Sequence, residues 1–138
     1  MTAIRPHAFT VPPSLAELER MADEALGTIP EPLRRHVRNV LIQVEDFPDE
    51  ETEREMKLVS PFDLLGLYRG VDLTRQSIGD IRTMPDAIFL YRRPILDYWC
   101  ETGEDLYGIV RHVLIHEVGH HFGFSDDDMD RIENSDTE

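Results

Sequence analysis

Two histidines and a glutamate near the end of the chain have the spacing of a metal site. They lie in the segment His116-Glu117-Val118-Gly119-His120, which has the H-E-x-x-H pattern. Histidines four residues apart on a helix project from one face, about a turn apart, so both imidazoles can bind one Zn²⁺. Glu117 points to the neighbouring face, where its carboxylate can act as general base on a metal-activated water. The pattern therefore predicts zinc-dependent hydrolysis.

The residues after the second histidine supply a candidate third ligand. The sequence continues to Gly123 and Asp126, which matches the longer H-E-x-x-H-x-x-G-x-x-(H or D) pattern. A glycine with positive φ lets the chain leave the helix abruptly and brings position 126 back toward the metal. Asp126 is therefore the predicted third ligand, and its neighbours Asp127 and Asp128 are alternatives.

Other residues near the motif are weaker candidates for metal ligands. His112 lies one turn before the motif on the metal face, where it could support a ligand or face substrate. His121 faces away from that stripe. A glutamate ligand from a second helix fits poorly, because Glu133 and Glu138 lie in a short acidic tail. Met129 is expected to make ordinary packing contacts in that tail.

Two amphipathic helices are predicted to position these residues. The motif helix runs from Gly103 or Glu104 to Phe122, with apolar residues at helical intervals and Gly123 as its stop. A second helix begins with Ser14-Leu15-Ala16-Glu17, which has capping-box spacing, and ends at Gly27.

Three short segments are predicted to form strands. Residues 39–45 are rich in β-branched side chains, a weaker strand lies around residues 67–68, and residues 87–92 form the clearest strand. Pro85 and Pro94 flank the last of these, which is typical of an edge strand. The acidic residues 46–55 are expected to form a solvated loop or a marginal helix.

The length and composition limit the possible domain organisation and the possible partners. A chain of 138 residues with 41% hydrophobic residues is expected to form one globular domain. We expect residues 1–13 to form an extended arm, residues 14–129 the domain, and residues 130–138 an acidic tail without apolar periodicity.

The net charge of −14 argues against a nucleic-acid partner. A single cysteine, Cys100, and the lack of an apolar run of signal-peptide or membrane-span length favour a cytoplasmic protein without a membrane partner.

The motif and two upstream segments resemble the small bacterial zincin-like metallopeptidase family. The resemblance lies in HEVGHHFGFSDDD at residues 116–128, in the strand at residues 85–92, and in SPFDLLGLYRG at residues 60–70. It implies an α+β fold, the minimal zincin: a small mixed β-sheet packed on an N-terminal helix and on the helix that carries the motif. It also implies that His116, His120 and Asp126 bind Zn²⁺ and that Glu117 is the general base.

The resemblance implies a zinc metallopeptidase acting on a peptide or protein in extended conformation. In zincins a sheet edge beside the active helix holds the substrate by main-chain hydrogen bonds, and the strand at residues 87–92 is the predicted edge. Phe89, Tyr91 and Arg92 are the corresponding substrate-binding candidates. One alternative is a metal-binding regulatory or peptide-binding module with little or no turnover. Another is hydrolysis of a non-peptide amide, which the sequence does not separate from peptidase activity.

Overall fold

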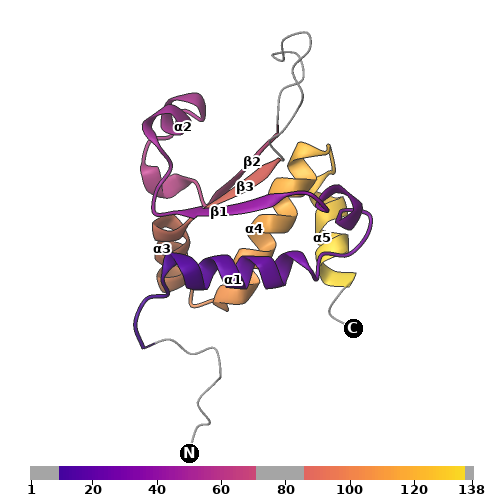
Figure 1. The fold of residues 1–138 in the computed structure, drawn as a ribbon, viewed down its shortest axis with the longest axis horizontal. Helices are drawn as coiled ribbons and strands as arrows, with labels where there is room; N and C mark the ends of the chain where they lie inside the picture. Colours follow the sequence, from indigo (N-terminus) through magenta and orange to yellow (C-terminus); the bar gives the residue numbers. More distant parts are fainter. Residues whose placement is uncertain (1–9, 71–85, 136–138) are drawn as a thin grey trace, which may run out of the picture.

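The structure is a computed structural model, and it describes residues 10–70 and 86–135. The described elements are α1 (Leu15–Leu26), β1 (Leu41–Glu45), α2 (Glu50–Glu55), β2 (Gly66–Arg69), β3 (Ala87–Tyr91), α3 (Arg92–Thr102), α4 (Leu106–His121) and α5 (Asp126–Asn134). Two 3-10 turns, η1 (Arg34–His36) and η2 (Pro61–Asp63), precede β1 and β2. The α+β class predicted from the sequence is confirmed (Figure 1). The greater part of the predicted N-terminal arm lies outside the described residues.

The three strands form one mixed sheet with the order β1-β3-β2. β1 pairs with β3 in parallel, with Ile42 opposite Ile88, and β2 pairs with β3 in antiparallel, with Tyr68 opposite Ile88. The prediction that β3 is an edge strand is therefore wrong. The prediction relied on Pro94, which lies in the first turn of α3. The backbone N–H groups of a first helical turn have no partner within the helix, so a proline there loses no hydrogen bond.

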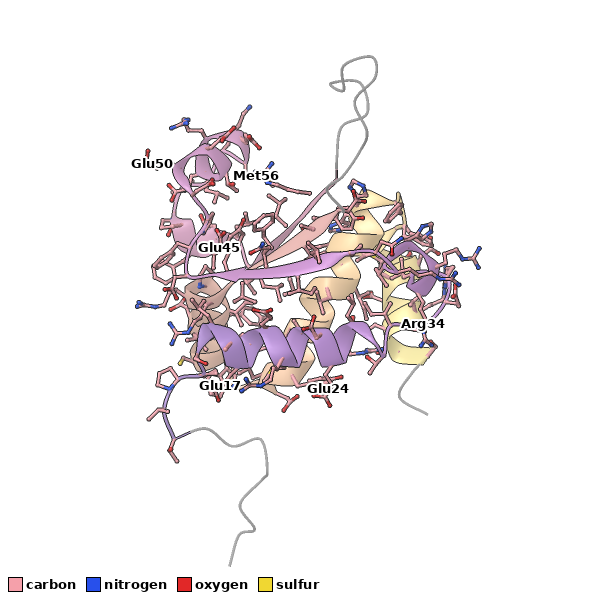
Figure 2. All side chains as sticks on the ribbon, in the orientation of Figure 1. Glu17, Glu24, Arg34, Glu45, Glu50 and Met56 are labelled. Carbon is pink, nitrogen blue, oxygen red and sulfur yellow. The ribbon has the colours of Figure 1, made fainter. Side chains whose placement is uncertain are left out.

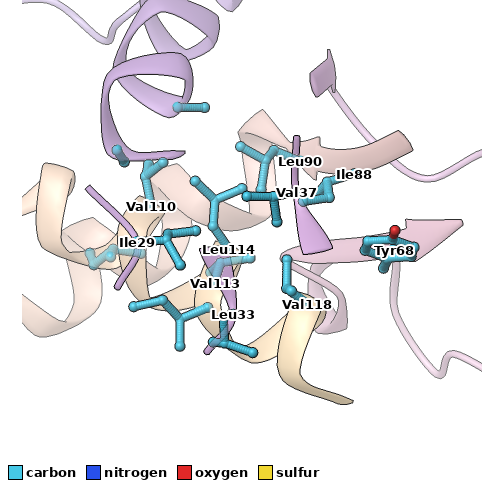
Figure 3. Close-up of a cluster of buried hydrophobic side chains, with 14 of the residues drawn as sticks. Ile29, Leu33, Val37, Tyr68, Ile88, Leu90, Val110, Val113, Leu114 and Val118 are labelled. Atoms are coloured by element: carbon cyan, nitrogen blue, oxygen red, sulfur yellow. The ribbon is translucent and has the colours of Figure 1, made fainter. Parts of the chain in front are cut away.

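The two predicted amphipathic helices, α1 and α4, cover the same face of the sheet (Figure 1). Alternation along β3 directs Ile88 and Leu90 to this face, and both are fully buried. Figure 3 shows them with Val110, Leu114 and Val118 of α4 in the main hydrophobic cluster. Most of α4 is therefore fixed by apolar packing, and its polar stripe is held in place by the core.

α2 lies on the other side of the sheet and projects from the body of the molecule (Figure 2). Three of its four glutamates are exposed, but Thr52 is buried and its hydroxyl accepts a hydrogen bond of 2.9 Å from Arg69 of β2. The acidic segment thus includes a short helix, which Asp49 caps through the backbone N–H of Thr52.

Two helices were not expected from the sequence. α3 begins directly after β3, where Pro94 was read as the end of a strand and not as the first turn of a helix. α5 occupies Asp126–Asn134, so residues 130–134 of the predicted acidic tail are helical. A capping box starts α5: the Ser125 hydroxyl accepts the N–H of Asp128, and the Asp128 carboxylate accepts the N–H of Ser125. Met129 and Ile132 then bury the inner face of α5.

Candidate metal centre

α4 presents three histidines in a stripe, at positions 112, 116 and 120. The four-residue spacing places them on one face, as the sequence predicts for the last two. The ring centroids of His112 and His116 are 4.0 Å apart, and those of His116 and His120 are 5.9 Å apart. His116 is the most enclosed of the three, with its side chain 19% exposed, whereas His112 and His120 are exposed.

The inner histidine has a buried nitrogen with no hydrogen-bond partner. Nε2 of His116 is inaccessible to solvent and no described group bonds to it. A buried polar atom left unpaired costs on the order of 1–3 kcal/mol, and it needs a local reason. Burial lowers the pKa of this imidazole, and the nearby His112 acts in the same direction. His116 is thereby kept neutral, the form that donates to a metal ion.

Glu117 lies between α4 and the sheet. Burial raises the pKa of its carboxyl, while His120 and a hydrogen bond from the Tyr68 backbone act in the opposite direction. A raised pKa brings the carboxyl closer to neutral pH, where a general base works best. The Glu117 carboxylate thus lies near His120 and accepts a hydrogen bond from the backbone of β2.

The loop after α4 brings Asp126 to His120. Gly123 has φ +82°, the left-handed conformation expected for the chain reversal. Asp126 Oδ1 lies 3.3 Å from His120 Nε2, and one donor atom from each of His116, His120 and Asp126 lies within 4.8 Å of the others. Asp128 is instead engaged by Ser125 and Arg131. Of the three neighbouring aspartates, Asp126 is therefore the one that joins the histidines.

A further carboxylate reaches the same histidines from α5. Glu133 Oε1 lies 2.9 Å from His112 Nδ1 and 3.8 Å from His116 Nε2. The expectation that a glutamate from a second helix fits poorly is wrong, because this segment is helical and folds back onto α4. The capping box at Ser125, followed by apolar residues at 129 and 132, was the sequence signal that could have located this helix.

The contact between α4 and α5 depends on Gly119 within the motif. An ideal Cβ at Gly119 would lie 2.7 Å from Met129 Cγ and still closer to its sulfur. Met129 is fully buried there, so it packs against α4 at Gly119. The absence of a side chain at position 119 lets α5 approach closely enough for Glu133 to face the histidines.

The substrate-binding residues predicted on β3 do not join this site. Phe89 and Tyr91 alternate with Ile88 and Leu90, so they face the side of the sheet opposite α4. Tyr91 is buried, which raises its pKa to about 12. Arg92 begins α3 and donates to the Pro13 carbonyl and the Asp46 carboxylate. These residues stabilise the fold, and both edges of β3 are occupied by neighbouring strands.

The strand beside the site is β2. Its Tyr68 stacks on His121 with ring centroids 4.0 Å apart, and an ideal Cβ at Gly70 would touch the same imidazole. The Tyr91 N–H donates to the Leu65 carbonyl, so by antiparallel alternation the backbone groups of Gly66 and Tyr68 point away from β3. In the described part of the chain, β2 is the sheet edge nearest to Glu117.

A pocket of about 610 Å³ opens next to His112 and Glu133. Leu65, which precedes β2, and side chains of α3 and α4 form the apolar part of its wall, and Glu104, Asp105 and Glu133 add carboxylates. No Lys or Arg lines it among the described residues. The pocket is thus a recess with apolar walls and negative charge beside the histidine stripe.

The donor chemistry of this centre suits a zinc-type ion. Two imidazoles and a carboxylate, with further coordination positions open, are the donor set of catalytic zinc sites. The unpaired Nε2 of His116 supports this assignment, since a bound cation would satisfy it. The structure therefore brings together nitrogen donors on α4 and an oxygen donor at the start of α5.

Fold and site together describe a small α+β protein with candidate metal-binding histidines on one helix. A model of the zincin-like metallopeptidase family matches residues 37–135, which span β1 to α5, and the chain belongs to that family. A comparison with curated proteins found no match. Among the described residues, no helix is both long and apolar enough to cross a membrane.

Proposed function

We propose that this protein is a zinc-dependent peptidase in which Glu117 is the general base. The observation that carries the proposal is the placement of Glu117: its partly buried carboxylate lies beside two histidines at ligand spacing and beside a sheet edge. Membership of the zincin-like metallopeptidase family supports the same activity. A regulatory metal-binding module would need the histidines but not a base with a raised pKa.

His116, His120 and Asp126 would hold the ion. A bound Zn²⁺ supplies Lewis-acid polarisation of the scissile carbonyl and acidifies water at this place. Glu117 accepts the proton of the attacking water and passes it to the leaving nitrogen. Burial lowers the pKa of His116, which favours the neutral imidazole that a metal ion binds.

We assign the extended substrate to the edge of β2 in place of β3. A peptide added along Gly66–Arg69 would pass Glu117, whose carboxylate is already bonded to this backbone. The neighbouring pocket would take one substrate side chain. Its apolar wall and its carboxylates at Glu104 and Asp105 favour a long basic side chain.

The test is cleavage of a peptide library by the wild type and by Glu117→Gln, with bound zinc measured by mass spectrometry. We expect Glu117→Gln to keep its zinc and to lose about 10²–10⁴-fold in kcat, the usual worth of general acid–base catalysis. Glu101→Gln, which alters an exposed carboxylate on α3, is the matched control and should cleave normally.

Other outcomes identify the alternatives. Zinc bound by the wild type with no cleavage of any peptide would favour a binding or regulatory module. Cleavage that survives Glu117→Gln would contradict the role of this residue. Activity confined to non-peptide amides would leave the hydrolytic chemistry in place and change the substrate class.

A further inference from the structure

Glu133 lies against two histidines of α4, one of which is outside the H-E-x-x-H motif. Its two carboxylate oxygens are 2.9 and 3.1 Å from Nδ1 of His112, and Oε1 is 3.8 Å from Nε2 of His116. One donor atom from each of these three residues lies within 4.8 Å of the others. This trio, which we call the outer set, shares His116 with the inner set of His116, His120 and Asp126.

The position of Glu133 is fixed by the packing of α5. Met129 is fully buried against Gly119, and Glu133 follows it by four residues, so it lies on the same face of α5. Its side chain is 22% exposed, whereas that of Asp126 is 82% exposed. The outer set therefore has the more enclosed carboxylate of the two sets.

The distances in the outer set suit a small cation. Zinc-to-donor bonds of about 2.0–2.1 Å place the donors on one tetrahedral ion roughly 3.3 Å apart. The separations of 2.9 and 3.8 Å between Glu133 and the two imidazoles bracket this value. An ion here would also satisfy the buried Nε2 of His116, which the bond between His112 and Glu133 does not.

We propose that α4 and α5 hold a divalent transition-metal ion at a second position formed by His112, His116 and Glu133. Nε2 of His116 has one lone pair, so the ion occupies either the inner or the outer set. Glu117 belongs to neither donor set and lies toward β2, so an ion in the outer set is held away from the general base. The outer set is thus an alternative resting position, and it does not depend on peptidase activity.

The experiment measures Co²⁺ binding to the full chain by equilibrium dialysis and visible absorption. The double variant His120→Gln/Asp126→Asn removes the inner set. We expect it to bind one Co²⁺ with an altered visible spectrum, because the outer set remains. Adding Glu133→Gln should weaken this binding at least tenfold. Adding Asp127→Asn, which removes an exposed carboxylate of the same helix, should not.

Two results would overturn the proposal. One is a folded double variant, verified by circular dichroism, that binds no Co²⁺. The other is an effect of Glu133→Gln no larger than that of Asp127→Asn. If the double variant does not fold, Asp126→Asn alone provides the background, since it leaves α4 unchanged, and the same comparison of Glu133→Gln with Asp127→Asn decides.

Discussion

At the scale of single residues, His116 is the centre of the site. It belongs to both donor sets, and its Nε2 is buried without a partner among the described groups. Its chemistry follows from enclosure: burial disfavours the protonated ring. The two flanking histidines on the same face are more exposed.

The lowered pKa of His116 predicts a pH dependence of stability in the metal-free chain. The imidazole has a pKa near 6.5 when unfolded and a lower pKa when folded. The stability contributed by its neutral form is therefore complete above pH 6.5 and is lost as pH falls through the folded-state pKa. Urea unfolding in EDTA should show the free energy of unfolding falling below pH 6.5. His116→Gln should remove this part of the slope, and an unchanged slope would contradict the assignment.

At the scale of secondary structure, α5 is the element that completes the centre. Ser125 caps it, and Met129 and Ile132 fix it to the core. Its first turn supplies Asp126, and its last turn supplies Glu133, so this helix brings a carboxylate to each donor set. The position of α5 therefore determines which carboxylates face the histidines of α4.

Removing the cap of α5 should weaken both stability and metal affinity. Ser125→Ala loses the hydroxyl that accepts the Asp128 N–H, which costs about 0.5–2 kcal/mol of unfolding free energy. Ser14→Ala is the matched control, because it removes the same type of capping box from α1. Urea unfolding should show similar losses, whereas calorimetry should show weaker zinc binding only for Ser125→Ala. Equal zinc affinity in the two variants would mean that α5 does not order the ligands.

Gly119→Ala tests the close approach of the two helices. The added Cβ would overlap Met129, which must move or displace α5, at a cost of about 1–3 kcal/mol. We expect lower unfolding free energy and weaker zinc binding. Shortening the opposing side chain in Gly119→Ala/Met129→Ala should relieve the overlap and recover metal affinity in part. If the single variant binds zinc as the wild type does, α5 approaches α4 without need of this glycine.

At the scale of the whole molecule, a bound ion would add a further link between α4 and α5, which the core already packs together. The inner set joins α4 to the start of α5, and the outer set joins α4 to its end. The apolar cluster meanwhile fixes α4 to α1 and the sheet (Figure 3). The centre is thus supported by the core on one side and is open to solvent on the other.

Zinc should therefore stabilise the folded chain. An ion that binds only the folded state adds about 2.7 kcal/mol at a free concentration one hundred times its Kd. Differential scanning fluorimetry should show Tm rising with zinc concentration and returning to its starting value with EDTA. His116→Ala removes the donor common to both sets and should abolish the rise. A rise that persists in this variant would locate the stabilising ion elsewhere.

The sequence by itself determined the helices α1 and α4, the three strands and the spacing of His116, Glu117 and His120. These features depend on local periodicity and on neighbours within two turns, which a linear pattern records. The positive φ of Gly123 was predictable for the same reason, because the need for a reversal follows directly from the longer motif.

Only the tertiary structure decided the rest. Strand order placed β3 in the centre of the sheet, so β2 replaced it as the edge beside Glu117. The docking of Met129 against Gly119 turned an apparent acidic tail into a helix that directs Glu133 to the histidines. The first depends on contacts between strands distant in the chain, and the second on the packing of one helix against the helix before it. The composition of the segment that forms α5 shows that it is acidic, but its packing against α4 determines which of its carboxylates face the histidines.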